Sequence, residues 1–478
     1  MMRQIDIRNL IGTAGQLSLD VPHLQFHKGT TTCVIGSSGS GKSLCAAALS
    51  GLPMPGLDLS ADISLDGQPC QTPLWREHVF VLPQEPAVAL DPTMAVGLQL
   101  AEVFRWRRDA SYTLSTPAVL SAQVGLDTVD LEKVPDQLSG GMQQRIMIAM
   151  ALAARASFIV ADEPTKGLDN ESKTQVIDLF KKLKGTGRGL IIITHDLDVA
   201  EAMADDIVVF DQGKVVEIGP TNQVLRTPHS NAAKTLIECA PKHWADRAVV
   251  PVKTANPIVS LENVTFGFPN ASHTLSDVNL SIHSGEIVGL CGPSGVGKST
   301  LANLCLGLHK PMAGFARWFG DPLTPTAIRH HRTKFQKLFQ NPVMSFPPNL
   351  SLVDAFEKLS PDNGNGAATR ADLMHRLKLN EALLERRPDQ VSGGELQRLA
   401  IVRVLLAQPR FLVCDEPSSR LDMSIQKLAI DTITDYAAET NTAVLLISHD
   451  IDVLQKRAER VIVLRPGGVL QGLEVEIK

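Results

Sequence analysis

The feature that most constrains this chain is an internal repeat that spans almost its whole length. Five short motifs occur twice in the same order, and Lys42 and Lys298 in the first pair are 256 positions apart. That pair is GSSGSGKS at 36–43 and GPSGVGKS at 292–299, and it is followed by LPQEP and LFQNP, LSGGMQQR and VSGGELQR, VADEP and VCDEP, and THD and SHD. The repeat indicates that one domain type has been duplicated. The 478 residues are enough for two such domains.

Each half alternates β-rich runs such as FIVAD and GLIIITHD with helical patterns. This alternation predicts an α/β fold with a parallel sheet flanked by helices. Helical patterns such as ADLMHRLKLNEALLERR fill an insert between the second and third motifs. We expect domains at 1–239 and 258–478, with helical subdomains at about 86–137 and 342–390. Residues 240–257 contain three prolines and predict a linker that reaches roughly 60 Å when extended.

Composition excludes several classes of function. The formal net charge is −5 and the chain has no Lys-rich or Arg-rich arm, so nucleic acid is not an expected partner. Its seven cysteines form no CxxC pair or His-spaced cluster, which argues against zinc and favours a reducing cytoplasm. The run 146–161 is apolar, but Arg155 interrupts it and it is shorter than a bilayer requires. We expect a buried helix followed by a buried strand there, and no transmembrane segment.

The strongest chemical motif is GxxxxGK[ST], which follows an apolar strand in both halves. Backbone N–H groups of such a loop bind phosphate, aided by the positive end of the following helix. The alternative is a Gly-rich turn with an accidental lysine, which the strand–loop–helix context in both copies disfavours. The expected loops are Gly36, Ser37, Ser38, Gly39, Ser40 and Gly41, and Gly292, Pro293, Ser294, Gly295, Val296 and Gly297. Lys42 and Lys298 would neutralise the β- and γ-phosphates, and Ser43 and Ser299 would hold Mg²⁺.

Two acids end an apolar strand in each half, and a histidine follows a later strand. Asp162 and Asp415 suit the coordination sphere of Mg²⁺. The next residues, Glu163 and Glu416, suit polarisation of an attacking water. Alone, such acids could belong to a solvated loop or a helix N-terminus, and His195 and His449 could be ordinary strand-end residues. Their order and repetition favour catalytic roles instead, with each histidine contacting the γ-phosphate and the acid.

Together the motifs resemble those of the ABC ATPase family: Walker A, Q-loop, LSGGQ-like signature, Walker B with its glutamate, D-loop (Asp169, Asp422) and switch histidine. The resemblance covers nearly the whole chain. It implies two P-loop NTPase domains, each with a RecA-like parallel sheet core, a small antiparallel β part and a helical subdomain. It also implies that two cassettes pack face to face, so that each ATP lies between one Walker A motif and the signature of the other cassette.

The resemblance assigns the site residues as two crossed sets. One site would combine Lys42, Ser43, Gln84, Asp162, Glu163 and His195 with Ser392, Gly393 and Gly394. The other would combine Lys298, Ser299, Gln340, Asp415, Glu416 and His449 with Ser139, Gly140 and Gly141. The expected Mg²⁺ ligands are Ser43, Gln84, Asp162, Ser299, Gln340 and Asp415. Both sites are expected to hydrolyse ATP.

The two halves differ at the position that stacks on adenine in this family. Phe268 occupies it in the second half, and stacking on a base contributes about 1–3 kcal/mol. Subtracting 256 leads to Gly12, and no aromatic lies near it. We therefore expect the first site to bind adenine more weakly or through another group.

The Q-loop stretches QEPAVALDPTMAVGLQL and QNPVMSFPPNLSLVDAF resemble those of peptide and nickel importer ATPases. The resemblance implies a motor on the cytoplasmic face of the inner membrane, with two permease subunits and a substrate-binding protein as partners. We expect one copy per transporter. The cargo stays open between peptides, nickel and a metal chelate, with a lean towards metal. One alternative is a soluble tandem protein that acts on ribosomes, which the short, nearly neutral linker disfavours, or on DNA, which the lack of cysteines for a zinc module disfavours. Another is a non-hydrolysing structural role.

Overall fold

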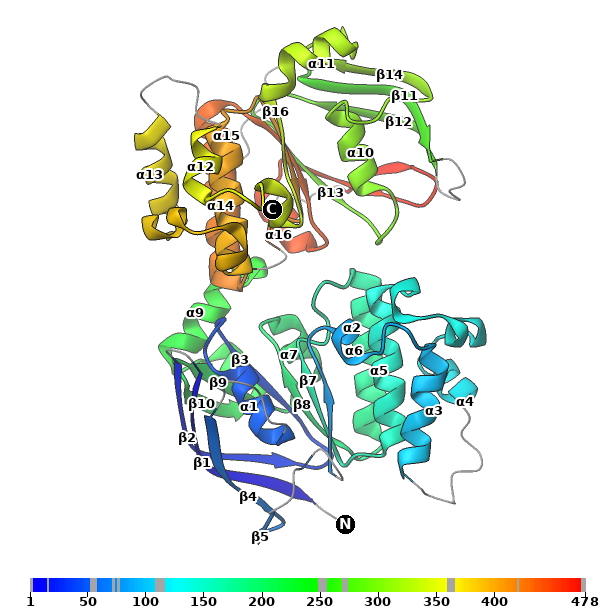
Figure 1. Cartoon of the computed structure of the whole chain (residues 1–478), viewed down its shortest axis with the longest axis vertical. Helices are drawn as coiled ribbons and strands as arrows, with labels where there is room; N and C mark the ends of the chain where they lie inside the picture. Colours follow the sequence, from blue (N-terminus) through cyan, green and yellow to red (C-terminus); the bar gives the residue numbers. More distant parts are fainter. Residues whose placement is uncertain are drawn as a thin grey trace. The chain divides into compact units, whose positions relative to one another are not determined.

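The chain forms two compact units, Met1–Glu238 and Cys239–Lys478. The computed structural model describes residues 3–14, 17–51, 58–70, 74, 78–107, 117–247, 256–268, 274–358, 366–418 and 421–473. Each unit contains a six-stranded and a four-stranded sheet with helices around them (Figure 1). This arrangement confirms the predicted α/β class and the repetition of one domain type.

A mostly parallel sheet forms the centre of the first unit, in the order β10-β9-β3-β8-β7-β6. Its strands are β3 (Thr31–Gly36), β6 (Val79–Leu82), β7 (Phe158–Asp162), β8 (Gly189–Ile193), β9 (Asp206–Asp211) and β10 (Lys214–Pro220). Only β10 runs antiparallel to its neighbour. All residues of β3 and β8 are buried, as expected for a parallel sheet covered on both faces.

A second, antiparallel sheet covers the phosphate-loop helix of the first unit. It has the order β2-β1-β4-β5, with β1 (Gln4–Ala14), β2 (Leu17–His27), β4 (Asp58–Leu65) and β5 (Gln68–Pro69). The helix α1 (Lys42–Ser50) contributes Cys45 and Leu49 to a core cluster that also contains Ile5 and Phe26 from this sheet and Val34 from the parallel one. The cluster therefore holds the two sheets together through α1.

The remaining helices of the first unit gather mainly at one side of the parallel sheet (Figure 1). They are α2 (Pro86–Ala89), α3 (Val96–Arg107), α4 (Pro117–Gln123), α5 (Gly140–Ala154), α6 (Asn170–Gly185), α7 (Leu197–Met203), α8 (Thr221–Arg226) and α9 (Asn231–Cys239), with 3₁₀ turns at Thr128–Glu132 and Pro135–Gln137. The apolar run at 146–161 is the buried part of α5 followed by β7, as expected. At the start of α5, Gly141 lies against α6, where an added Cβ would lie 3.2 Å from Ser172 Oγ.

The second unit repeats the plan, with sheets in the orders β16-β17-β18-β13-β19-β20 and β12-β11-β14-β15. Its strands are β11 (Val259–Gly267), β12 (Thr274–Ile282), β13 (Ile287–Cys291), β14 (Ala313–Trp318), β15 (Asp321–Pro322), β16 (Phe335–Leu338), β17 (Phe411–Asp415), β18 (Ala443–Ile447), β19 (Arg460–Leu464) and β20 (Leu470–Leu473). Its helices are α10 (Lys298–Cys305), α11 (Pro325–His331), α12 (Leu352–Glu357), α13 (Gly366–Arg376), α14 (Gly393–Leu406), α15 (Met423–Thr440) and α16 (Ile451–Arg457). Short 3₁₀ turns lie at Pro241–His243, Arg332–Lys334, Pro342–Ser345, Glu381–Glu385 and Pro388–Gln390.

The segment expected to be a free linker contains packed structure. The 3₁₀ turn Pro241–His243 precedes Trp244, whose side chain is buried with the core residues of the second unit. The chain therefore passes from one unit to the other at Cys239. Residues 248–255 of the expected linker lie outside the described residues.

Candidate nucleotide-binding sites

Each phosphate loop lies between a strand end and a helix start. The helices α1 and α10 begin at the lysine of the motif, and the residues before them, Gly41 and Gly297, have φ of 105° and 108°. Residues other than glycine rarely adopt this backbone conformation, which explains the glycine of the motif. A Cβ at Gly36 would also crowd the Ser40 Oγ at 2.7 Å. The loop backbone is thus tightly folded, with helix N-termini next to it that favour phosphate.

The lysines of the motif are held by the loops they belong to. Lys42 Nζ donates to the carbonyl oxygens of Gly36 at 2.8 Å and Ser37 at 2.6 Å. Lys298 Nζ donates to those of Gly292 and Pro293 at 2.7 and 2.9 Å. Both ammonium groups therefore lie within the loop that would surround a phosphate.

A serine hydroxyl and a strand-end carboxylate lie together in each unit. Ser299 Oγ donates to Asp415 Oδ2 at 3.0 Å. In the first unit burial raises the pKa of Asp162, while a hydrogen bond from Ser43 and the charge of Lys42 act in the opposite direction. A buried carboxylate beside a hydroxyl offers the hard oxygen ligands that Mg²⁺ prefers. The residues present therefore fit Mg²⁺, which would neutralise a carboxylate that burial disfavours as an anion.

The glutamate and the histidine form a hydrogen-bonded pair in both units. His195 Nδ1 lies 2.7 Å from Glu163 Oε1, and His449 Nδ1 lies 2.8 Å from Glu416 Oε2. Both glutamates have a positive φ, 48° and 51° respectively. Non-glycine residues with such angles are uncommon and cluster at functional sites. The expected pairing of acid and histidine is present in the structure of each unit.

The Q-loop glutamines are exposed and follow the strands next to the acid-bearing ones. Gln84 comes directly after β6 and Gln340 after β16, and these strands pair with β7 and β17. The carboxyl ends of parallel strands share one sheet edge, so each glutamine lies at the same edge as Asp162 or Asp415. An apolar residue four positions after each glutamine is also exposed: Val88 is 78% exposed and Met344 is 69% exposed.

The signature serines cap the helices that follow them. Ser139 accepts from Met142 N at the start of α5, and Ser392 accepts from Glu395 N at the start of α14. Both serines are exposed. In the first unit Gly141 lies beside Ser172, close to the D-loop residue Asp169, which caps α6. Each signature is thus presented at a helix N-terminus, and in the first unit it lies next to the D-loop.

Strands β1 and β11 lead to the position that was expected to stack on adenine, and their geometry corrects the match between Gly12 and Phe268. Asn9 in β1 and Asn263 in β11 both have φ near 50° and precede a register shift with the neighbouring strand. Their spacing of 254 makes Ala14, not Gly12, the counterpart of Phe268. The offset of 256 was wrong here because the hairpin after β1 is two residues shorter than the one after β11.

Gly12 cannot take an aromatic side chain without rearrangement. A Cβ there would lie 2.7 Å from the carbonyl oxygen of Asp58 and against the Leu59 side chain. In the second unit Phe268 is 48% exposed and contacts Phe266 and His309 edge-to-face, with ring centroids 5.1 and 5.6 Å away. The aromatic difference between the units therefore remains, although at another position.

A hollow of about 630 Å³ lies against the phosphate loop of the first unit. It is lined by Leu17, Ser18 and Asp20 of β2, the loop residues Ser37 to Ser40, and Asp211, Gln212 and Lys214 at the β9–β10 turn. Its walls are mostly polar. The hollow thus offers hydrogen-bonding groups beside the phosphate loop.

One charged residue near the sites was missed by the sequence reasoning. Lys337 in β16 lies with its Nζ 3.2 Å from Asp415 Oδ2, and it also donates to Asn303 on α10 at 3.1 Å. Its side chain is only 12% exposed. The signal was available, because the corresponding residue 256 positions earlier is Val81, and a lysine within an otherwise buried strand is unusual.

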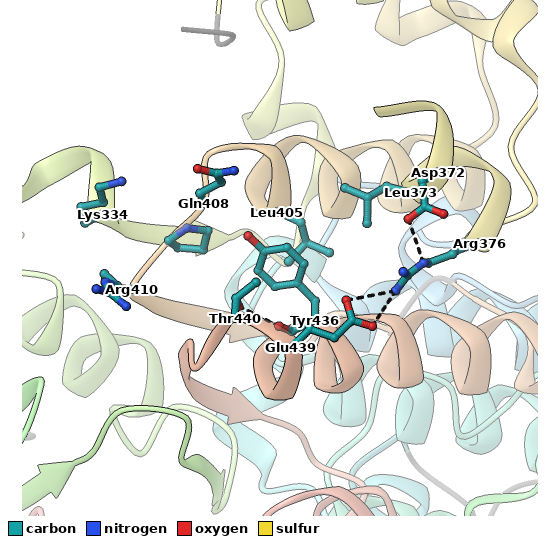
Figure 2. Close-up of a pocket in the computed structure, with 11 residues that line it drawn as sticks. Lys334, Asp372, Leu373, Arg376, Leu405, Gln408, Arg410, Tyr436, Glu439 and Thr440 are labelled. Atoms are coloured by element: carbon teal, nitrogen blue, oxygen red, sulfur yellow. Dashed lines mark hydrogen bonds and ion pairs between the residues drawn. The ribbon is translucent and has the colours of Figure 1, made fainter. Parts of the chain in front are cut away.

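A second hollow, of about 550 Å³, lies in the second unit at the opposite edge of the parallel sheet (Figure 2). It is lined by residues that precede β16, β17 and β18, among them Lys334, Arg410 and Thr440. Arg376 reaches Glu439 on one side of it at 3.1 Å. These walls contain neither phosphate loop nor strand-end acid, so the hollow is separate from the nucleotide site.

Comparisons with known proteins agree with this geometry. The family model described as ABC transporter matches residues 19–166 and 275–419, so it matches both units. The chain belongs to the ABC transporter family. It is an ATP hydrolase with two ABC ATP-binding domains in tandem.

Relatives with the same tandem layout are known. The chain is 31% identical to the peptidoglycan transport ATP-binding protein YejF of Agrobacterium fabrum, covering 96% of this chain and 89% of the relative. It is 32% identical to the glutathione import ATP-binding protein GsiA of Escherichia coli K12, covering 94% and 82%. Among solved structures, the complex of archaeal stalk protein aP1 with ribosome recycling factor aABCE1 aligns with a TM-score of 0.71 and 21% identity over 97% of this chain and 89% of that chain. That likeness concerns the fold alone.

Among the helices that the structure describes, none has the length and apolar character needed to cross a membrane.

Proposed function

We propose that this protein is the ATP-hydrolysing subunit of an importer and that it acts on two separate permease subunits, supplied by a substrate-binding protein, at the cytoplasmic face of the inner membrane. The names of its relatives YejF and GsiA support transport. The single structural observation that carries the proposal is the exposure of Val88 and Met344 at equivalent places beside the two Q-loop glutamines. Exposed apolar side chains at repeated positions suit contact with another protein.

Residues 1–239 and 258–478 would act as the two ATP-binding domains, with crossed sites. In each site the phosphate loop and its lysine hold the phosphates. The serine and glycine N–H groups at the start of α14 or α5 would complete the γ-phosphate contacts from the other domain. The exposure of Ser139 and Ser392 supports this role, because a signature that served only its own unit would not need to face outward.

The chemistry follows from the acid–histidine pair. Glu163 or Glu416 would accept a hydrogen bond from the attacking water and orient it towards the γ-phosphorus. His195 or His449 holds the carboxylate through its Nδ1 and would contact the γ-phosphate with its ring. Bound Mg²⁺ would supply charge neutralisation of the β- and γ-oxygens. Ser43 with Asp162, and Ser299 with Asp415, would hold it, and the exposed glutamines Gln84 and Gln340 would join when the Q-loops close.

Small peptides are the proposed cargo class. The sequence alone left the cargo open between peptides, nickel and a metal chelate, with a lean towards metal. The relatives YejF and GsiA carry names that refer to peptidoglycan and glutathione instead. A peptide cargo would be recognised by the binding protein and the permeases.

The stoichiometry gives a direct test. One copy of this chain per two permease subunits is expected, because joining the two cassettes raises their effective concentration for each other. Native mass spectrometry of the purified complex should show this ratio, and uptake of radiolabelled glutathione or a tripeptide should require the chain. Two copies per pair of permeases, or nickel uptake without peptide uptake, would contradict the proposal.

A ribosomal role is the alternative that experiment should exclude, and the structural likeness to aABCE1 does not favour it. At 21% identity that likeness extends to the fold and no further. Association of the chain with ribosomes rather than membranes in sedimentation would support this alternative.

We expect the two sites to differ in their need for Mg²⁺, because Lys337 competes for Asp415. The ammonium and the metal would share Oδ2, the atom that Lys337 approaches at 3.2 Å. In Lys337→Val, the Mg²⁺ concentration for half-maximal ATP binding at the second site should fall about fivefold, which corresponds to about 1 kcal/mol. Photoaffinity labelling by azido-ATP across a Mg²⁺ titration, mapped to each unit by proteolysis, measures this without turnover.

Two variants control this experiment. Lys337→Arg keeps the charge and should leave the Mg²⁺ dependence of the second site close to that of the wild type. Val81→Lys places a cation in the first site and should raise the Mg²⁺ requirement there. Identical titrations for Lys337→Val and the wild type would show that the ion pair between Lys337 and Asp415 does not weaken Mg²⁺ binding.

A further inference from the structure

Residues 240–247, called the strap below, join the first unit to the second and pack as part of the second. Trp244 is only 2% exposed, and its indole Nε1 donates to the carbonyl oxygen of Cys239 at 2.8 Å. A freely moving linker would leave such a ring in solvent. The strap is therefore an ordered element of the second unit.

The strap is fastened to α16. The guanidinium of Arg457 lies 4.7 Å from the centroid of the Trp244 ring, which is within the range of a cation–π contact. Arg457 also donates to the Ala245 carbonyl oxygen at 2.9 Å. Lys456 pairs with Asp246 at 2.7 Å. Three consecutive strap residues thus engage the last two residues of α16.

The strap is also fastened to α15. Arg247 donates to the carbonyl oxygen of Thr434 at 2.7 Å. Lys427 lies 5.8 Å from the Trp244 ring centroid. Asp431 bridges the two helices, since it accepts from Lys427 at 2.6 Å and from Arg457 at 2.8 Å. The Trp244 ring therefore lies over an ion-pair cluster that joins α15 to α16.

These two helices begin at nucleotide-site residues. Asp422 of the D-loop is the N-cap of α15, and α16 follows His449 directly, with Asp450 as its N-cap. Because α16 has seven residues, its strap end is only about 10 Å from its His449 end at 1.5 Å per residue. A rigid helix of this length transmits a shift at one end to the other.

We propose that the strap positions the second ATP site, with Trp244 and Arg457 as positioning residues that act through α16 on His449 and through α15 on Asp422. The first unit holds the matching end of α7 in another way, through the Thr221 hydroxyl of α8, which donates to the Ala204 carbonyl oxygen at 2.8 Å. The second unit uses a segment that arrives from the end of the first cassette. Cys239, the last residue of α9, accepts the hydrogen bond from the Trp244 indole.

The test compares trapping at the two sites of the complete transporter. Trp244→Ala should lower vanadate-trapped azido-nucleotide at the second phosphate loop at least tenfold. Equilibrium binding of ATP there should stay within twofold, because Lys298 and its loop are untouched. Trapping at the first phosphate loop should fall less. Trp244→Phe, which keeps a ring for Arg457, should restore second-site trapping to within threefold of the wild type.

Trp318→Ala is the matched control. Trp318 is also 2% exposed, and its indole also donates to a cysteine carbonyl oxygen, that of Cys305, at 2.8 Å. Trp318 lies in β14, and its partner Cys305 ends α10, the helix that begins at Lys298 of the second phosphate loop. Loss of the Trp318 ring should therefore lower the melting temperature and weaken equilibrium binding of ATP at that loop, whereas Trp244→Ala should leave that binding within twofold. If Trp244→Ala does not fold, Arg457→Gln keeps the ring buried and should show the same selective loss.

The inference rests on the proposed role of His449, and His449→Ala separates the two claims. Full trapping in His449→Ala would overturn the site assignment itself. Loss in His449→Ala together with wild-type trapping in both Trp244→Ala and Arg457→Gln would overturn the strap and leave the site assignment in place. Weakened ATP binding at the second phosphate loop in Trp244→Ala, to the same degree as in Trp318→Ala, would reduce Trp244 to an ordinary core residue.

Discussion

ATP turnover should fall at least 100-fold when Glu163 and Glu416 are both replaced by glutamine, whereas ATP binding should persist. The amide keeps the size of the carboxylate but cannot polarise water, and loss of such a group typically costs 10²–10⁴-fold. The phosphate contacts of Lys42 and Lys298 are unaffected. The double variant should therefore accumulate ATP-bound protein in a closed form.

Phosphate release by the purified transporter and retention of radiolabelled ATP after gel filtration measure the two effects. Each single variant should lose turnover at its own site, which separates the contributions of the two units. Glu171→Gln, at an exposed glutamate in the first turn of α6, provides the control and should hydrolyse ATP normally. Wild-type rates in the double variant would show that another group activates the water.

Hydrolysis at the first phosphate loop should be lost, by roughly two orders of magnitude, in Ser392→Arg. The proposed crossed arrangement places Ser392 against the phosphate held by Lys42, so a bulky cation there would block the γ-phosphate donors. The magnitude is that of losing one oxyanion-type donor, about 10²–10³-fold. Vanadate trapping of azido-ATP, mapped to each unit, should show the loss at the first phosphate loop while the second persists.

The substitution also removes a helix cap, which costs about 1 kcal/mol of stability. Ser351→Arg matches that loss, since Ser351 caps α12 through Asp354 N much as Ser392 caps α14. It should leave trapping intact. Ser139→Arg should give the mirror-image result, with loss at the second phosphate loop. Loss at the second phosphate loop in Ser392→Arg would mean that each cassette uses its own signature.

Much of the fold could be predicted because the signals are local and occur twice. Apolar strands followed by GxxxxGK[ST] or by Asp–Glu place the phosphate loops and the acids at one sheet edge, as the structure does. The hydrogen bond of Glu163 with His195 was also anticipated, although 32 positions separate the two residues. Motifs at sheet edges are predictable because the order of the strands brings them together.

Other features could not be predicted, because a constant spacing between the two repeats does not hold throughout and because a linker-like composition does not exclude packing. Gly12 was matched to Phe268 because one spacing was applied across a hairpin whose length differs between the units. Lys337 was overlooked because it lies outside every motif, and its role appears only when β16 is paired with β17 beside Asp415. Trp244 lies in a proline-containing stretch that resembles a linker. The partners of the strap on α15 and α16 lie far along the chain. Thr434 is 187 positions from Arg247, and Arg457 is 212 positions from Ala245.

The left-handed backbone at Glu163 and Glu416 has a consequence for evolution and engineering. Each such residue costs about 1–3 kcal/mol, a sizeable part of the ~5–15 kcal/mol by which a domain is stable. Glycine or asparagine would relieve that cost at either position. Selection for thermal stability alone would therefore favour replacement of the two glutamates. The resulting cassettes would be more stable but would not hydrolyse ATP. The glutamates are retained against this pressure only in a lineage where turnover itself is selected.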